Sequence, residues 1–93
     1  MAKKNHKEIN GQIVIYPAWG SNIQCFKNYK TFVQGKIYSI YGCGNAKDNQ
    51  GKKHEVWHLV TLHDNNKRFP VKKETINTLF DNGVLGHYYE LNN

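Results

Sequence analysis

The sequence predicts a mainly β protein, a small and strongly bent antiparallel barrel with one short helix near its C-terminus. Three observations predict this fold. Short segments rich in β-branched and aromatic residues recur between clusters of glycine, asparagine and aspartate. One segment alone has the apolar spacing of a helix. The 93 residues suffice for one domain, so we expect a single domain over residues 9–93 after a flexible basic arm over residues 1–8.

The expected sheet is built from five strands. They lie near residues 12–16, 36–41, 55–63, 67–72 and 87–91. The stretch IQCF, residues 23–26, favours a further short strand. The segment GCGNAKDNQGKK, residues 42–53, is rich in turn residues, and we expect a solvated hairpin loop there. It does not match a phosphate-binding P-loop, because six residues rather than four separate Gly44 from Gly51.

The one helix is expected over residues 73–81. Ile76, Leu79 and Phe80 have i, i+3, i+4 spacing, and Gly83 suits a left-handed cap beyond the helix end. The core is expected to contain one of Val14 and Ile15, one of Val56 and Trp57, and the residues Tyr38, Ile40, Val60, Phe69, Val71, Ile76, Leu79 and Phe80.

The string HEVWH, residues 54–58, has the spacing by which helical metalloproteases bind zinc. On a helix both imidazoles reach one ion, and the glutamate activates the bound water. The residues that follow are β-branched and aromatic and favour a strand instead. In a strand, His54 and His58 would lie roughly 13 Å apart and could not bind one ion. We therefore expect no metal and no cofactor, with a small zinc hydrolase as a remote alternative.

The chain carries a net charge of +6, and all thirteen of its basic residues lie within residues 1–73. A basic body favours an anionic partner such as nucleic acid. Lys, Asn, Ile and Tyr have AT-rich codons, however, and they make up 37 of the 93 residues, so an AT-rich gene explains part of the charge. Without a long apolar run or a signal segment, we expect a cytoplasmic protein with no membrane contact, whose Cys25 and Cys43 are free thiols.

The run FVQGKIYSIYG, followed after a loop by VWHLVTLHDNNKRFPVKK, resembles many small phage-encoded SH3-like proteins. In that family, a Gly-Lys-x-Tyr strand precedes a strand ending in Asp-Asn-x-Lys/Arg and a Phe-x-Val strand. The likeness covers roughly residues 32–73. It implies an SH3-like barrel, a phage origin with the host cytoplasm as location, and a class of proteins that bind peptides, proteins or nucleic acids and are seldom enzymes.

We expect a protein that is not an enzyme, because no nucleophile stands beside a suitable base and the five histidines are scattered. The leading interpretation is a phage-type accessory module that occupies a surface on a host protein or protein–nucleic-acid complex, as a partner or inhibitor. One of Tyr88 and Tyr89 should be partly exposed. The expected binding surface uses exposed aromatic residues framed by cations, namely Trp19, Tyr29, Tyr41, Lys52, Lys53, Lys67, Arg68 and Lys72.

Direct and largely sequence-independent binding of DNA or RNA is the alternative. If residues 67–72 form a strand, Arg68 and Lys72 share the face opposite Phe69 and Val71. A nearby aromatic ring such as Tyr41 would complete a basic stripe on which bases can stack. A plainer interpretation competes with this one, because lysines at turns and on edge strands also keep a sheet soluble and unpaired.

Overall fold

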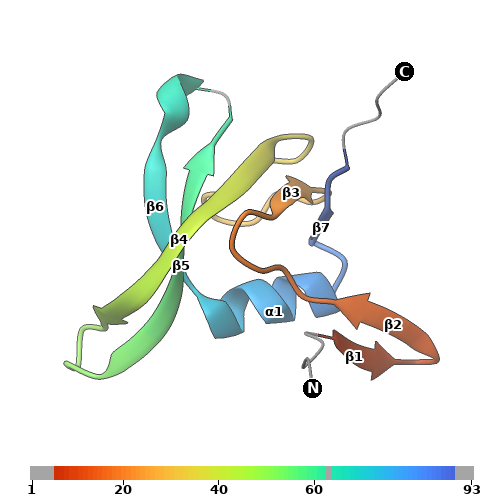
Figure 1. The fold of residues 1–93 in the computed structure, drawn as a ribbon, viewed down its shortest axis with the longest axis horizontal. Helices are drawn as coiled ribbons and strands as arrows, with labels where there is room; N and C mark the ends of the chain where they lie inside the picture. The colour runs from red at the N-terminus through yellow and green to blue at the C-terminus, as the bar shows by residue number, and fades with distance from the viewer. Residues whose placement is uncertain (1–5, 63, 90–93) are drawn as a thin grey trace.

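The computed structural model describes residues 6–62 and 64–89 of the chain. In chain order, its elements are β1 (His6–Ile9), β2 (Gln12–Ile15), β3 (Asn22–Cys25), β4 (Ile37–Lys47), β5 (Lys53–Thr61), the 3-10 turn η1 (Asp64–Asn66), β6 (Arg68–Lys72), α1 (Lys73–Asp81) and β7 (Leu85–His87). Five strands form one antiparallel sheet in the order β6-β5-β4-β3-β7, while β1 and β2 form a separate hairpin (Figure 1). The prediction of a mainly β chain with one helix is confirmed.

The five-stranded sheet has two edges, β6 and β7. No ladder joins these edges within residues 6–62 and 64–89, so the strands form an open antiparallel sheet and the expected closed barrel is not seen. Helix α1 follows β6 directly and packs on one face of the sheet, where the core lies (Figure 1).

The prediction of a long loop over residues 42–53 was wrong. Strand β4 continues to Lys47 and β5 begins at Lys53, so the connection is confined to residues 48–52. Residues 42–47 of β4 pair with β5, and this pairing holds the glycine-rich stretch in the sheet although glycine has a poor strand propensity of its own. Asp48 closes the short turn, since its Oδ1 accepts hydrogen bonds from the amides of Gln50 and Lys52 at 2.9 Å each.

The hairpin at the N-terminal end of the described chain begins within the range expected for the arm. Residues 6–8 belong to β1, and residues 1–5 lie outside the described part of the chain. The turn between β1 and β2 is Asn10-Gly11 with φ angles of 52° and 80°, a pair that suits tight hairpins because both residues tolerate positive φ. Near the other terminus, β7 spans residues 85–87 rather than 87–91, and residues 90 and 91 are not described.

Helix α1 matches the expected range, 73–81, and ends as predicted. Gly83 follows it with φ of 75°, and its amide donates to the carbonyl of Phe80. The amide of Val84 donates to the carbonyl of Leu79 at 2.9 Å, which completes a Schellman motif. Val84 then packs against the core, so the cap turns the chain back towards β7.

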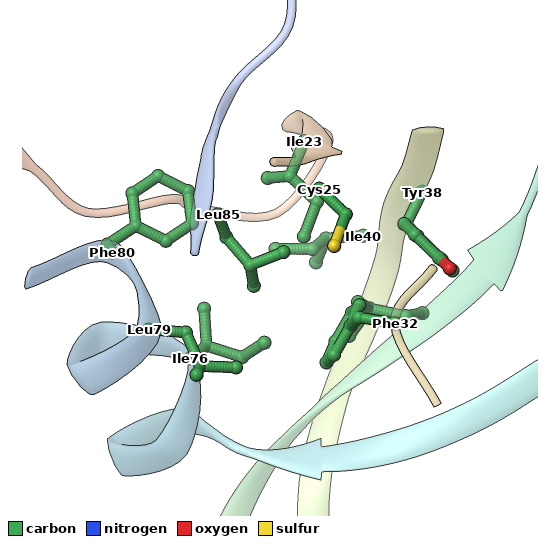
Figure 2. Packing of buried hydrophobic residues seen from close by; sticks show 10 residues of the cluster. Ile23, Cys25, Phe32, Tyr38, Ile40, Ile76, Leu79, Phe80 and Leu85 are labelled. Atoms are coloured by element: carbon green, nitrogen blue, oxygen red, sulfur yellow. The ribbon is translucent and has the colours of Figure 1, made fainter. Parts of the chain in front are cut away.

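The core lies between α1 and the sheet (Figure 2). Five predicted members belong to this cluster, namely Tyr38, Ile40, Ile76, Leu79 and Phe80. Val56 is also buried, as predicted, but it lies outside the cluster. Val14, Trp57, Phe69 and Val71 are partly buried against this cluster. The prediction for Val60 was wrong, because β5 turns Leu59 rather than Val60 towards the helix. The core residues that the sequence did not single out are Ile23, Cys25, Phe32, Leu59 and Leu85.

Candidate functional site

One face of the β4–β5–β6 part of the sheet points away from the core. We call it the outer face. The strand register defines three rows across this face, each with one residue from β4, one from β5 and one from β6. The rows are Ser39, Val60 and Arg68; Gly42, His58 and Pro70; and Gly44, Val56 and Lys72. The neighbouring row of Ile40, Leu59 and Phe69 belongs to the core side. Because side chains alternate along a strand, Arg68 and Lys72 share the outer face, as predicted.

Tyr41 lies on the outer face because of a bulge. The register of β4 and β5 shifts between Ile40 and Gly42, so Tyr41 has no direct partner on β5. The guanidinium carbon of Arg68 lies 5.2 Å from the centroid of the Tyr41 ring. The centroid of the His58 imidazole, on β5, lies 6.0 Å from the centroid of the Tyr41 ring. The predicted combination of Arg68, Lys72 and a neighbouring Tyr41 is therefore present.

Small residues make the β4 side of the outer face shallow. Gly42 and Gly44 flank His58, and a methyl group added at Gly44 would lie 3.1 Å from Nε2 of His58. The ring of His58 thus rests almost against the backbone of β4.

The outer face carries no acidic residue in the rows of β4, β5 and β6 described above. Asp48 lies at the hairpin tip, where its Oδ2 accepts a hydrogen bond from Nε2 of His54 at 2.8 Å. This bond, aided by the amides of Lys52 and Gln50, lowers the pKa of Asp48 to about 2. In the part of the chain that the structure describes, no lysine or arginine forms an ion pair. These cations are therefore available to an anionic partner.

A hollow of about 340 Å³ adjoins the outer face at the Arg68 end. Its lining residues are Thr31, Val33, Tyr38, Thr61, Lys67, Arg68 and Phe69. The hydroxyl of Tyr38 fixes one wall, because it accepts from the amide of Val33 at 2.9 Å. The hollow thus combines an apolar floor with the two cations Lys67 and Arg68 at its edge.

The other predicted site residues are not assembled with these. Trp19 is 72% exposed in the turn before β3, and Tyr29 is 37% exposed with Nζ of Lys30 5.5 Å from its ring centroid. Lys52 lies in the β4–β5 turn, and Lys53 begins β5 opposite Lys47. The expected exposure of Trp19, Tyr29, Tyr41 and Tyr89 is confirmed. A single patch made of all these aromatics is not seen among the described contacts.

The HEVWH string lies in β5, which confirms the strand prediction. Alternation places Glu55 on the face opposite His54 and His58. No group of three or more His, Cys, Asp or Glu side chains suited to a metal ion occurs within residues 6–62 and 64–89. Cys25 is buried, and burial raises the pKa of its thiol, which donates a hydrogen bond to the carbonyl of Lys27.

Sequence reasoning missed a second cluster around Lys73. Nζ of Lys73 lies 4.3 Å from the centroid of the Trp57 ring. Together with Tyr16, Pro17 and Asn77, these residues line a cavity of about 230 Å³. The available signal was the four-residue spacing of Lys73 and Asn77 on the predicted helix, but nothing in the sequence brought Tyr16 or Trp57 to that face.

Comparison with known proteins adds no relative. No family model matches the chain, and neither the curated proteins nor the solved structures give a significant match. None of the helices in the described residues is long and apolar enough to span a membrane.

Proposed function

We propose that this chain is a non-catalytic module that binds single-stranded nucleic acid through the outer face. The observation that carries the proposal is the contact of Arg68 with Tyr41, beside His58 and on the same face as Lys72. Aromatic rings that stack on bases, next to cations that bind phosphates, are the two parts that such proteins combine. We prefer nucleic-acid binding to binding of a protein partner. The predicted aromatic residues are dispersed over the surface, whereas Arg68, Lys72 and Tyr41 lie together on the outer face.

The dimensions of the stripe suit a single strand. Arg68 and Lys72 are four residues apart on one strand, or roughly 13 Å. Each strand of a duplex carries one phosphate per about 3.4 Å of helix axis, and the axial spacing is larger when a single strand is extended, so the stripe spans a few phosphates. Tyr41 stacks best on a base that is not already stacked in a helix, and this favours single-stranded over double-stranded partners.

A protein partner is the second candidate, and the hollow favours it. Val33 and Phe69 offer an apolar floor, and Lys67 and Arg68 would bind acidic groups of the partner. The SH3-like barrel and the role of a phage-encoded accessory protein remain part of the proposal, supported by the likeness over residues 32–73.

Binding of fluorescently labelled oligothymidylate, measured by anisotropy at about 50 mM and about 200 mM salt, tests the proposal. We expect micromolar affinity that falls steeply with salt. Arg68→Gln should weaken binding and reduce the logarithmic salt slope by about 0.7, the value for one phosphate contact on a single strand. Lys7→Gln is the matched control, since it removes one charge from β1, outside the outer face.

Two results would contradict the proposal. One is no binding at the lower salt concentration, and the other is an equal loss in Arg68→Gln and Lys7→Gln, which would indicate a diffuse charge effect. Val33→Asn and Lys72→Gln then separate the two candidates. The affinity for a nucleic-acid strand on the outer face should depend on Lys72, whereas the affinity for a protein bound in the hollow should depend on Val33.

A further inference from the structure

The cavity beside Lys73 lies where three parts of the chain meet. Lys73 and Asn77 come from α1, Trp57 comes from β5, and Tyr16 and Pro17 follow β2. The chain that leaves β2 passes next to α1 on its way to β3 (Figure 1). Cavities at the junction of several elements are the usual places for small ligands.

The aromatic wall is held in place from the helix. The hydroxyl of Tyr16 donates to Oδ1 of Asp81 at 2.6 Å. Asp81 follows Asn77 and Lys73 at four-residue intervals, so all three share one face of α1. This bond fixes the Tyr16 ring along the same helix face that carries Asn77 and Lys73.

The cation of the cavity is oriented before any ligand arrives. The Lys73 ammonium stands over the Trp57 ring at 4.3 Å from its centroid and has no carboxylate partner in the described residues. A lysine held on an aromatic ring has already lost part of its rotamer freedom, so binding an anion costs less conformational entropy. The ammonium can still donate hydrogen bonds on the side away from the ring.

Positive charge continues outside the cavity. A second depression of about 240 Å³ shares Lys73 and is lined by Lys53, His54, Glu55, Lys72 and Glu74. Its three lysines outnumber its two glutamates, so the approach to Lys73 favours an anion. Lys72 and His54 also belong to the outer face, so this depression lies between the outer face and the cavity.

We infer that the cavity lined by Tyr16, Trp57, Lys73 and Asn77 binds a nucleotide. The planar base lies against the aromatic and proline walls, the Asn77 amide hydrogen-bonds to the base edge, and Lys73 binds the phosphate. Asparagine offers both a donor and an acceptor, as base edges require. A volume of about 230 Å³ lies below the usual range for drug-sized ligands, so the cavity would hold the base of a nucleotide rather than a dinucleotide. The site is separate from Tyr41 and Arg68 and does not depend on the outer face.

Adenosine monophosphate is the probe for this site, and the readouts are the Trp57 indole and Asn77 side-chain amide resonances in a ¹⁵N NMR spectrum. The chain has two tryptophans, so the Trp19→Phe background leaves one indole signal. We expect adenosine monophosphate at millimolar concentration to shift both resonances. Lys73→Gln should weaken this binding about tenfold, the effect of losing one charge-assisted hydrogen bond. Lys30→Gln, which also removes a lysine from above an exposed ring, is the matched control.

The remaining probes decide the chemistry. Adenosine should bind more weakly than its monophosphate, and inorganic phosphate should not reproduce the Trp57 shift. Asn77→Ala should weaken binding of the nucleotide as a second variant, independent of Lys73. The inference is overturned if adenosine monophosphate shifts neither resonance, if adenosine or inorganic phosphate binds equally well, or if an acidic peptide binds more tightly. If a 5′-phosphorylated oligonucleotide binds more tightly than adenosine monophosphate, the natural ligand is the end of a nucleic-acid strand. If the two affinities are equal, the natural ligand is a free nucleotide.

Discussion

The guanidinium carbon of Arg68 lies 5.2 Å from the centroid of the Tyr41 ring, although the two residues belong to strands that flank β5 on opposite sides. The contact spans β5 because the bulge in β4 releases Tyr41 from pairing. Arg68 and Tyr41 thus form one cation–aromatic pair on the outer face. The proposed binding of nucleic acid depends on this pair.

Tyr41→Ala tests the aromatic half of the pair. Loss of one base-stacking ring should cost about 1–3 kcal/mol of binding free energy for oligothymidylate. Tyr29→Ala is a close control, because Tyr29 is 37% exposed against 41% for Tyr41 and also has a cation, Lys30, over its ring. Anisotropy titrations of both variants measure the difference. Equal losses would show that Tyr41 has no special part in binding.

Gly44→Ala tests the close approach of His58 to β4. A methyl group there would lie 3.1 Å from Nε2 of His58, closer than about nine in ten such contacts, whereas one at Gly42 would lie at an ordinary 3.9 Å from Cβ and Cδ2 of His58. We expect Gly44→Ala to move the His58 ring, and with it the Tyr41 ring 6.0 Å away. Aromatic chemical shifts report the movement. The idea fails if Gly42→Ala perturbs the two rings as much as Gly44→Ala does.

Leu79→Ala tests whether α1 closes the core. Leu79 is 3% exposed and belongs to the main core cluster, so its truncation should lower the free energy of unfolding by about 2–4 kcal/mol. The neighbouring Thr78 is exposed, and Thr78→Ala should change stability by less than about 0.5 kcal/mol. Urea denaturation measures both. A loss below about 0.5 kcal/mol for Leu79→Ala would show that the helix is peripheral.

The sequence predicted the helix and its cap because the signals there are local. Ile76, Leu79 and Phe80 report the buried face, and Gly83 alone can turn the chain cheaply at positive φ. The β4–β5 hairpin could not be predicted in the same way. Glycines that mark a turn elsewhere lie inside β4, because pairing with β5 outweighs their local preference.

The candidate site was predictable where it depends on alternation along one strand. Arg68 and Lys72 were placed on one face from their spacing alone, and the structure agrees. The cluster of Tyr16, Trp57 and Lys73 was not predictable, since it depends on how three distant segments pack. Strand alternation also left open which face of β5 is buried. Leu59 faces the core and Val60 does not, a choice fixed by the register with β4 rather than by either residue.

Acid titration tests the turn at Asp48. The hydrogen bond from His54, with help from two backbone amides, lowers the pKa of Asp48 from 3.8 to about 2. A depressed carboxyl pKa contributes stability that is fully present above about pH 4 and is lost as the pH falls through 2. Carbon-13 shifts of the carboxyl group should therefore show a midpoint near 2. His54→Gln should raise the pKa of Asp48, and a midpoint that stays unchanged in this variant would contradict the assigned cause.

Hydrogen bonds with α1 and β7 attach the end of the β1–β2 hairpin to the rest of the fold. Tyr16 donates to Asp81 at 2.6 Å, and Nε2 of His87 donates to the carbonyl of Ile15 at 2.8 Å. The bond to Asp81, followed by burial and the negative charge of Asp81, raises the pKa of Tyr16 above its usual 10.0. The bond is therefore present below pH 10 and is lost as the pH rises through the raised pKa of Tyr16.

Tyr16→Phe removes this bond at neutral pH and keeps the ring. Amide hydrogen exchange in β1 and β2 should become faster, because one of the two side-chain hydrogen bonds that attach the hairpin within the described residues is lost. Exchange in β4 and β5 should stay unchanged, since their pairing does not involve Tyr16. Tyr29→Phe serves as the control for loss of a tyrosine hydroxyl elsewhere. Unchanged exchange in β1 and β2 would mean that the partly buried Val14 holds the hairpin without help from Asp81.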